Sequence, residues 1–152
     1  MLKYFFINVL VPLTIGGILY LLFRDQKLLM FKTVEELGLL TKLNQIRVWS
    51  NEWRLQIPDW IIFSLPNALW EYSMLSFWRW VWDSNKNVFR LMSIGTVGLC
   101  VLIEVFQLMH LIPGTFCWED ILLILISAAI FKIVNQCITF NQIEKSYEAP
   151  ID

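Results

Sequence analysis

The sequence has 152 residues, of which 57% are hydrophobic and 15% aromatic, and its formal net charge at pH 7 is −1. A soluble domain contains about 45–50% apolar residues, so the mean hydropathy of +0.58 favours a chain that lies in a membrane. The small net charge gives no indication of a nucleic-acid partner. Three cysteines and one histidine supply neither a disulfide framework nor the ligands of a structural zinc site, so no metal or cofactor is expected.

The first apolar block covers residues 4–23 and contains no charged side chain. A helix of about twenty residues is about 30 Å long, which matches the hydrocarbon thickness of a bilayer. The block is too long for the apolar core of a signal peptide, and Arg24 and Asp25 follow it instead of a cleavage site with small residues. We therefore predict an uncleaved first transmembrane span.

The next stretch, residues 28–56, mixes apolar and charged side chains. Thr33 and Glu36 have the spacing of a capping box with Thr33 as N-cap, and apolar residues follow at helical intervals. This pattern predicts an amphipathic helix over about 34–46 that lies at the membrane surface. The alternative is an ordinary loop helix that packs on the end of a bundle.

Three further apolar blocks follow, over about 57–82, 88–112 and 121–140. Pro66 lies inside the first of them and is expected to kink it. Short polar turns join the blocks, so consecutive helices should be antiparallel. The expected fold class is all-α, a four-helix transmembrane bundle with an interfacial amphipathic helix between the first and second spans. Residues 1–140 would form this single membrane domain, and residues 141–152 a polar tail.

Several polar side chains occur inside these apolar blocks, where an ionisable group is costly and usually faces the bundle interior. Glu104 and Gln107 are three residues apart and therefore share one helix face. Asp120 opens the last helix, and the short turn before it should keep it close to Gln107. Asn67 and His110 are expected in the same half of the bundle. The predicted ligand-binding site therefore consists of Glu104, Gln107, Asp120, Asn67 and His110.

A second prediction concerns Glu71 and Lys132, which have opposite charges at similar expected depths and should form a structural pair. A simpler interpretation of all these polar groups is that they hold helices together through contacts worth about 0.6–2 kcal/mol each. The sequence lacks Gly-x-Ser-x-Gly and His-Glu-x-x-His motifs. A small intramembrane hydrolase or protease is therefore the least favoured function.

The motif Glu104-x-x-Gln107, followed by a short turn and by Asp120 at the start of the last helix, resembles the VanZ-like family of small bacterial membrane proteins. The expected spans and the length of 152 residues also fit that family. The chain departs from the family pattern where Gly114 lies near the arginine position, Ile124 replaces an asparagine and Ala128 lies near a glycine. The resemblance implies a multi-pass protein of the bacterial cytoplasmic (inner) membrane with a role in the cell envelope.

The function expected from this resemblance is the binding of a lipid-linked or amphipathic ligand in a polar cavity within the membrane. The expected partners are membrane lipid and either a lipid-linked envelope precursor or another membrane protein. The alternative is a non-catalytic membrane subunit of a larger complex, whose polar groups serve packing and partner recognition. The turn between the third and fourth spans contains Glu119 and Asp120 but no Lys or Arg, which favours both termini on the cytoplasmic side.

Overall fold

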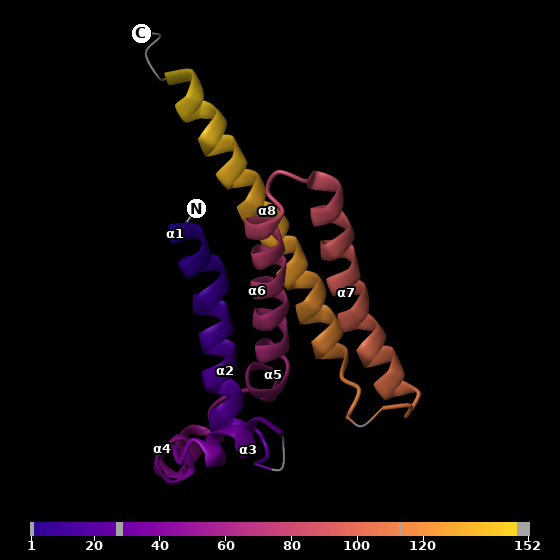
Figure 1. Cartoon of the computed structure of the whole chain (residues 1–152). Coiled ribbons are helices and arrows are strands. Elements are labelled where there is room, and N and C mark those ends of the chain that lie inside the picture. The colour runs from indigo at the N-terminus through magenta and orange to yellow at the C-terminus, as the bar shows by residue number, and fades with distance from the viewer. Residues whose placement is uncertain (1, 27–28, 113, 149–152) are drawn as a thin grey trace.

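The computed structural model describes residues 2–26, 29–112 and 114–148, and every regular element in these ranges is helical. The first expected span is a continuous helical segment made of α1 (Leu2–Phe5), the π-helical stretch η1 (Phe6–Leu10) and α2 (Val11–Phe23). The remaining helices are α3 (Leu29–Glu36), α4 (Leu40–Trp53), α5 (Asp59–Phe63), α6 (Leu65–Val81), α7 (Lys86–Leu108) and α8 (Trp118–Glu148). Figure 1 shows α2, α6, α7 and α8 side by side.

Three of the described helical segments are long and apolar enough to cross a membrane, namely Leu2–Phe23, Lys86–Leu108 and Trp118–Ile138. The second expected span, 57–82, is not one continuous helix, because Ser64 separates α5 from the 17-residue α6. α6 alone is about 26 Å long. Pro66 lies at the start of α6, where its missing N–H group needs no partner in the preceding turn. The predicted kink is therefore an interruption of the helix.

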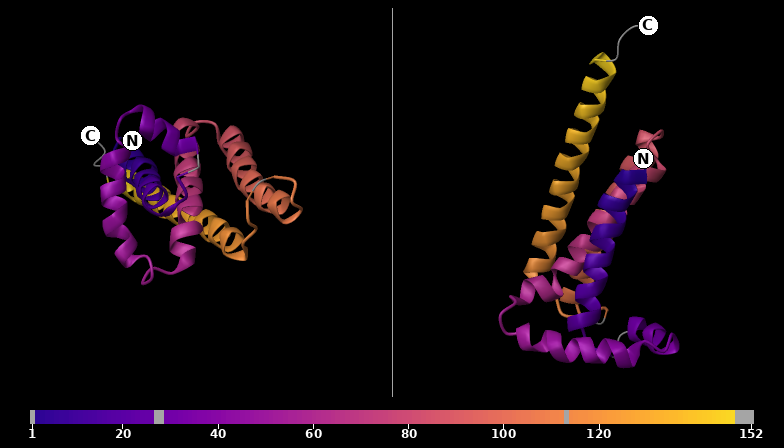
Figure 2. Two further views of the ribbon diagram at one scale, coloured as in Figure 1. Left: turned by 90° about the horizontal axis from the view of Figure 1, so that it is seen from below. Right: turned by 90° about the vertical axis from the view of Figure 1, so that its left-hand side faces the viewer.

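α6 lies at the centre of the bundle and contacts α2, α7 and α8 (Figures 1 and 2). It contributes six buried residues: Pro66, Ala68, Glu71, Ser73, Leu75 and Ser76. Small residues at such contacts allow helices to approach closely. Gly16 of α2 is one example, because a Cβ atom there would lie 2.7 Å from Nε1 of Trp70. The interior is thus built around α6, whereas α2, α7 and α8 expose many large apolar side chains on their outer faces.

The π-helical stretch η1 is held by two hydrogen bonds from α6. The Ser73 hydroxyl donates to the carbonyl oxygen of Val9 (2.8 Å), and the Tyr72 hydroxyl donates to Oδ1 of Asn8 (2.8 Å). A π-helical turn changes the backbone hydrogen-bond pattern, and a side-chain donor on the neighbouring helix gives one of its carbonyls an additional partner. These contacts fix the position of the first segment along α6.

The single helix predicted over 34–46 is instead two helices, α3 and α4, which run across one end of the bundle (Figure 2, right). Thr33 lies inside α3, so the predicted capping box is wrong. Gly38 has a φ of +69°, and its N–H donates to Glu35 O (2.8 Å) while Leu39 N–H donates to Val34 O (3.1 Å). This is a Schellman motif, in which glycine ends a helix because it adopts positive φ without strain.

Arg47 ties α4 to the end of α2. Its guanidinium donates to the carbonyl oxygens of Leu21 (2.6 Å) and Arg24 (2.7 Å). The last carbonyls of a helix have no partner within the helix and carry partial negative charge, so a cation is well placed there. The desolvation of the Arg47 guanidinium lowers its pKa from the usual value. α4 is therefore joined directly to the end of the first apolar segment.

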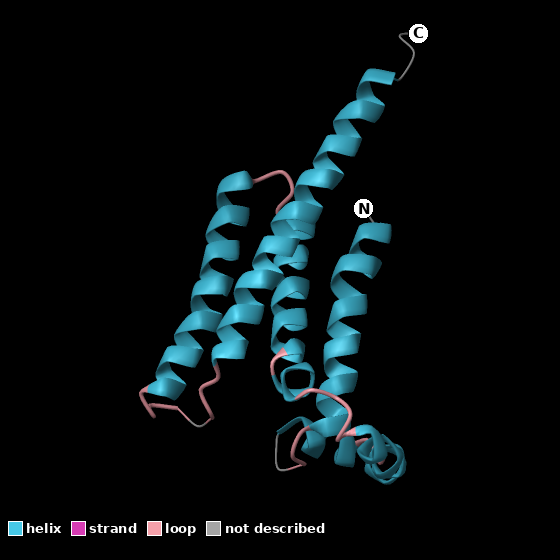
Figure 3. Cartoon of the chain, turned by 180° about the vertical axis from the view of Figure 1, so that it is seen from behind, coloured by secondary structure: helices cyan, strands magenta, loops and turns pink. Residues whose placement is uncertain are grey.

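Two further helix boundaries differ from those expected. α7 ends at Leu108 instead of near residue 112, and His110 beyond it has a φ of 57°, which is outside the right-handed helical region. α8 begins at Trp118 and continues to Glu148, so most of the segment expected to be a polar tail is the end of this helix. Figure 3 shows α8 extending beyond the neighbouring helices. Residues 149–152 lie outside the described residues.

Candidate functional site

Two carboxyl groups are buried where α7 and α8 meet, close to the turn that joins them. Glu104, near the end of α7, is 5% exposed, and Asp120, in the first turn of α8, is 7% exposed. The two helices are antiparallel neighbours, so these residues come to the same level of the bundle, and the Asp120 charge acts on the Glu104 carboxyl. The structure therefore brings together two of the predicted site residues.

Gln107 connects this pair to the turn between α7 and α8. With the amide nitrogen directed at the neighbouring acceptors, it donates to Oε2 of Glu104 (3.3 Å) and to the carbonyl oxygen of Thr115 (3.3 Å). Gly114 has a φ of +143°, and a Cβ atom there would lie 2.5 Å from the terminal amide group of Gln107. A side chain at this position would displace the Gln107 amide, and the positive φ favours glycine as well. The backbone of Cys117 also donates a hydrogen bond to Glu104.

Two residues of the site were not predicted from the sequence. Ser64, at the break between α5 and α6, is 2% exposed, and its side chain is a hydrogen-bond partner of the Asp120 carboxyl. Arg24, just after α2, lies close enough for its charge to act on Asp120. Its guanidinium donates to Phe63 O (3.0 Å) and stacks over the Tyr20 ring at 5.6 Å. A helix interruption before a proline is the one sequence signal that could have indicated Ser64.

A second polar level lies deeper in the bundle. The Ser127 hydroxyl donates to Oε2 of Glu71, which joins α8 to α6. Cys100 lies one turn before Glu104 on the same face of α7 and is close enough to both levels for the charges of Glu71 and Glu104 to act on its thiol. Ser127 follows Asp120 by seven residues, about 10 Å along the helix. We call the interior line from Asp120 and Ser64 through Glu104, Gln107 and Cys100 to Glu71 and Ser127 the polar seam.

Two acceptor atoms of the polar seam have no hydrogen-bond partner among the described residues. They are Oδ1 of Asp120 and Oε1 of Glu71, and both side chains are more than nine-tenths buried. Buried polar atoms are rarely left without a partner. The polar seam can therefore accept hydrogen bonds from, or be neutralised by, a group that enters it.

Three predicted residues lie elsewhere than expected. Lys132 is exposed on α8, so the predicted pair with Glu71 is not formed and Ser127 is the partner instead. His110 is exposed in the turn after α7, beyond the end of the helix that carries Glu104 and Gln107. Asn67 is half-buried on α6, between Ser64 and Glu71 on the same face, without joining the Glu104 and Asp120 cluster.

Within the described ranges, no group of three or more His, Cys, Asp and Glu side chains is arranged to hold a metal ion. Comparison of the chain with protein-family models, with curated proteins and with solved structures finds no match in any of the three. The class of protein is therefore defined by its helices. The described residues form an all-helical membrane protein, in which three helices are long and apolar enough to span a bilayer and a polar seam lies in the interior.

Proposed function

We propose that the chain is a VanZ-like protein of the bacterial cytoplasmic membrane that crosses the bilayer four times. Besides the three long helices, the segment made of α5 and α6 would cross the bilayer, as the second crossing in chain order. Its position supports this, because α6 lies among three helices that could each span a membrane. If α6 did not cross, one of its ends would lie within the hydrocarbon, where backbone groups without partners are costly. Reporter fusions after Lys27, Asn85, Trp118 and Lys145 should alternate between the two compartments. Two consecutive fusions on the same side would contradict four crossings.

In this proposal the protein serves the cell envelope by binding an amphipathic or lipid-linked ligand whose polar group donates hydrogen bonds. The single observation that carries the proposal is the Asp120 carboxyl, which is 7% exposed with Oδ1 unpartnered among the described residues. A ligand ammonium or hydroxyl group would satisfy this oxygen. Glu104 and Gln107 lie beside it and offer further hydrogen bonds.

An apolar cavity supports the amphipathic character of this ligand. It has a volume of about 240 Å³ and lies between α2, α6 and α8, where Pro12, Leu65, Leu123 and Ile130 are among its lining residues. Ser127 also lines this cavity and donates to Glu71. An acyl chain in the cavity would therefore reach the polar seam, so that one ligand could use both.

The test compares two lipids that differ in the methylation of the headgroup nitrogen, which removes its N–H donors. Dioctanoyl phosphatidylethanolamine donates through its ammonium group, whereas dioctanoyl phosphatidylcholine does not. Native mass spectrometry of the full chain in detergent should show tighter binding of the first lipid. Asp120→Asn should weaken this binding by about tenfold, as expected for the loss of a charged hydrogen bond. The neighbouring exposed acid, changed by Glu119→Gln, provides the matched control.

The alternative function, a non-catalytic subunit of a larger complex, is favoured by the contacts that already join the helices. Ser127 to Glu71 and Trp78 Nε1 to Thr96 Oγ1 (3.0 Å) are both interhelical. If the polar seam serves packing alone, Asp120→Asn should lower the thermal stability of the chain and leave the preference between the two lipids unchanged. That outcome would replace ligand binding by the packing function.

A further inference from the structure

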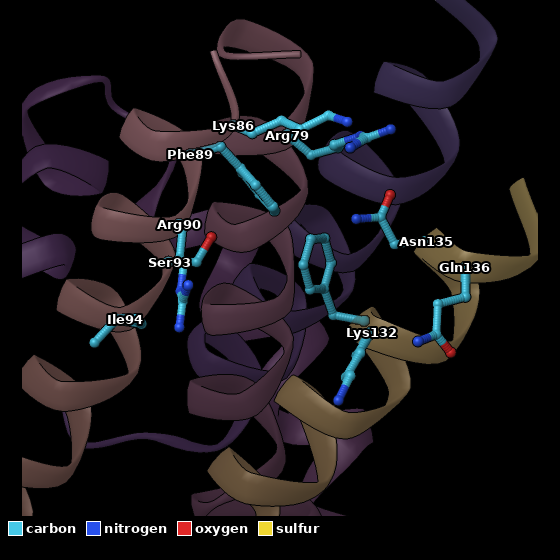
Figure 4. Close-up of a pocket in the computed structure, with 10 residues that line it drawn as sticks. Arg79, Lys86, Phe89, Arg90, Ser93, Ile94, Lys132, Asn135 and Gln136 are labelled. Atoms are coloured by element: carbon cyan, nitrogen blue, oxygen red, sulfur yellow. The ribbon is translucent and has the colours of Figure 1, made fainter. Parts of the chain in front are cut away.

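A second cavity lies at the opposite end of the bundle from the α7–α8 turn, between α6, α7 and α8. Its volume is about 870 Å³, within the range of pockets that hold small molecules. Its lining consists of Arg79, Lys86, Phe89, Arg90, Ser93, Ile94, Phe131, Lys132, Asn135 and Gln136. Figure 4 shows that α6, α7 and α8 each contribute polar side chains around this space. None of these residues belongs to the polar seam.

The charge of this lining is entirely positive. Arg79, Lys86, Arg90 and Lys132 carry cations, and no Asp or Glu is among the lining residues. Asp83, in the turn after α6, offsets one of these charges through its ion pair with Arg79 (3.3 Å). Lys86, Arg90 and Lys132 make no ion pair within the described part of the chain. Like charges around one cavity raise its potential and attract an anion.

Neutral groups in the same wall point to a ligand with both polar and apolar parts. Phe89 and Phe131 pack with their ring centroids 6.1 Å apart, and Ile94 also lines the cavity. The Ser93 hydroxyl is buried and has no hydrogen-bond partner among the described residues. Oxygen atoms of an anionic headgroup would accept from Ser93 and from the cations, while the aromatic wall would contact the start of an acyl chain.

The depth of the cations fits a molecule that enters from a bilayer. In Figure 4, Arg79 and Lys86 lie together near the turn between α6 and α7, while Arg90 and Lys132 lie further from that turn along α7 and α8. Lys86 and Arg90 are four residues apart, which is about 6 Å along α7. Long basic side chains near the end of a transmembrane helix extend toward the headgroup level. The cations therefore lie along the end of the bundle at which a phosphate of a lipid would lie.

We propose that this cavity binds the phosphate headgroup of an anionic phospholipid, with the phosphate held by Lys86, Arg90, Lys132 and Ser93 and the glycerol backbone against Phe89 and Phe131. Basic pockets between transmembrane helices recognise anionic lipid headgroups through the same combination of charge and apolar contact. The inference concerns another site than the polar seam and holds whether or not that site binds a ligand.

The experiment measures the binding of dioleoyl phosphatidylglycerol and dioleoyl phosphatidylcholine to the full chain in detergent by native mass spectrometry. The binding of phosphatidylglycerol should saturate as its concentration is raised, whereas phosphatidylcholine should show no saturable binding. Arg90→Gln and Lys132→Gln should each weaken phosphatidylglycerol binding by about fivefold, the effect of one cation near a headgroup. Lys132→Arg should restore it, because the charge is retained. Lys3→Gln, which removes an exposed cation of the first helix, is the matched control.

Three outcomes would overturn the assignment. The first is equal binding of the two lipids, and the second is an equal loss of phosphatidylglycerol binding in Lys3→Gln and Arg90→Gln. The third is displacement of phosphatidylglycerol by millimolar inorganic phosphate, which would show that the cavity selects free phosphate over a lipid. Melting of each variant in lipid-free detergent is measured in parallel. A variant that melts at the same temperature as the unaltered chain and still loses binding supports the site. For a variant that melts at a lower temperature, the binding measured for Lys132→Arg decides between loss of the site and loss of the fold.

Discussion

The hydrogen bond between Ser127 and Glu71 provides the sharpest test of how the interior is held together. Sequence reasoning assigned Lys132 to Glu71, whereas the structure assigns Ser127 and leaves Lys132 exposed. The test is a pair of double-mutant cycles. The first combines Glu71→Met with Ser127→Ala, and the second combines Glu71→Met with Lys132→Met. Methionine has about the length of glutamate and removes the carboxyl without leaving a large void.

The expected magnitude follows from the surroundings of the carboxyl. Glu71 is 3% exposed, and Oε1 has no partner among the described residues, so Ser127→Ala would leave neither oxygen hydrogen-bonded by a described residue. Leaving a buried acceptor unsatisfied costs about 1–3 kcal/mol, and interhelical hydrogen bonds in membranes reach about 1.7 kcal/mol. We expect Ser127→Ala to lower the free energy of unfolding by about 1–2 kcal/mol in the unaltered chain and by close to zero beside Glu71→Met.

The assay is reversible unfolding of the purified chain in mixed micelles with increasing sodium dodecyl sulfate, followed by helical circular dichroism. The Lys132 cycle should be additive within about 0.5 kcal/mol, as for residues that share no contact. A coupling free energy for Glu71 and Lys132 that equals or exceeds that for Glu71 and Ser127 would refute the assignment. The reasoning that interior carboxyl groups are held by uncharged partners would then be wrong.

Three further predictions follow from other parts of the chain. Gly16→Ala should be less stable than Gly17→Ala by about 1–3 kcal/mol in the same unfolding assay. A Cβ atom at Gly16 would lie 2.7 Å from Trp70, whereas one at Gly17 meets nothing within 4 Å. The gain in helix propensity is common to both changes, so equal stabilities would contradict the close approach of α2 and α6. Arg47→Met should lower stability by about 1–3 kcal/mol, since it removes two charged hydrogen bonds, one to Leu21 of α2 and one to Arg24 just after it. A change no larger than that of the exposed Lys42→Met would show that α4 is not tied there. The Cys117 thiol donates to the Glu119 carboxylate (2.6 Å), and this hydrogen bond raises the pKa of the thiol. Glu119→Gln should therefore speed the alkylation of Cys117 by iodoacetamide at pH 7.5, measured in a chain without Cys100 and Cys137. An unchanged rate would exclude this hydrogen bond.

The contacts of the buried acids show where sequence reasoning reaches its limit. That Glu104 and Gln107 share a face follows from the helical repeat alone, and the turn length placed Asp120 near them. The partners of these groups could not be found in the same way. Ser64 and Ser127 are neutral and common, so neither stands out in an apolar segment, whereas Lys132 stands out by its charge. An argument from charge alone therefore assigned the wrong partner to Glu71.

Helix ends show the same division at the level of the backbone. The sequence pattern of Thr33 and Glu36 favours a helix start, but the positive φ of Gly38 makes this stretch a helix end. A helix start and a helix end are both consistent with the local sequence, because a glycine two residues after a charged segment can lie in a loop or end a helix. His110 was expected inside the apolar block over 88–112, but it lies in the turn after α7.

The sequence by itself determined that the chain is helical and suited to a membrane, because long uncharged segments of about twenty residues have that property whatever they pack against. It also determined which carboxyl groups lie in those segments. The tertiary structure decided that α6 is the central helix, that Arg24 and Ser64 join Asp120, and that Arg79, Lys86, Arg90 and Lys132 surround one cavity. These facts depend on the rotation and axial position of each helix against its neighbours, which are set by contacts such as Gly16 with Trp70 and Ser73 with Val9. Such contacts join residues far apart in the chain, and no local pattern encodes them.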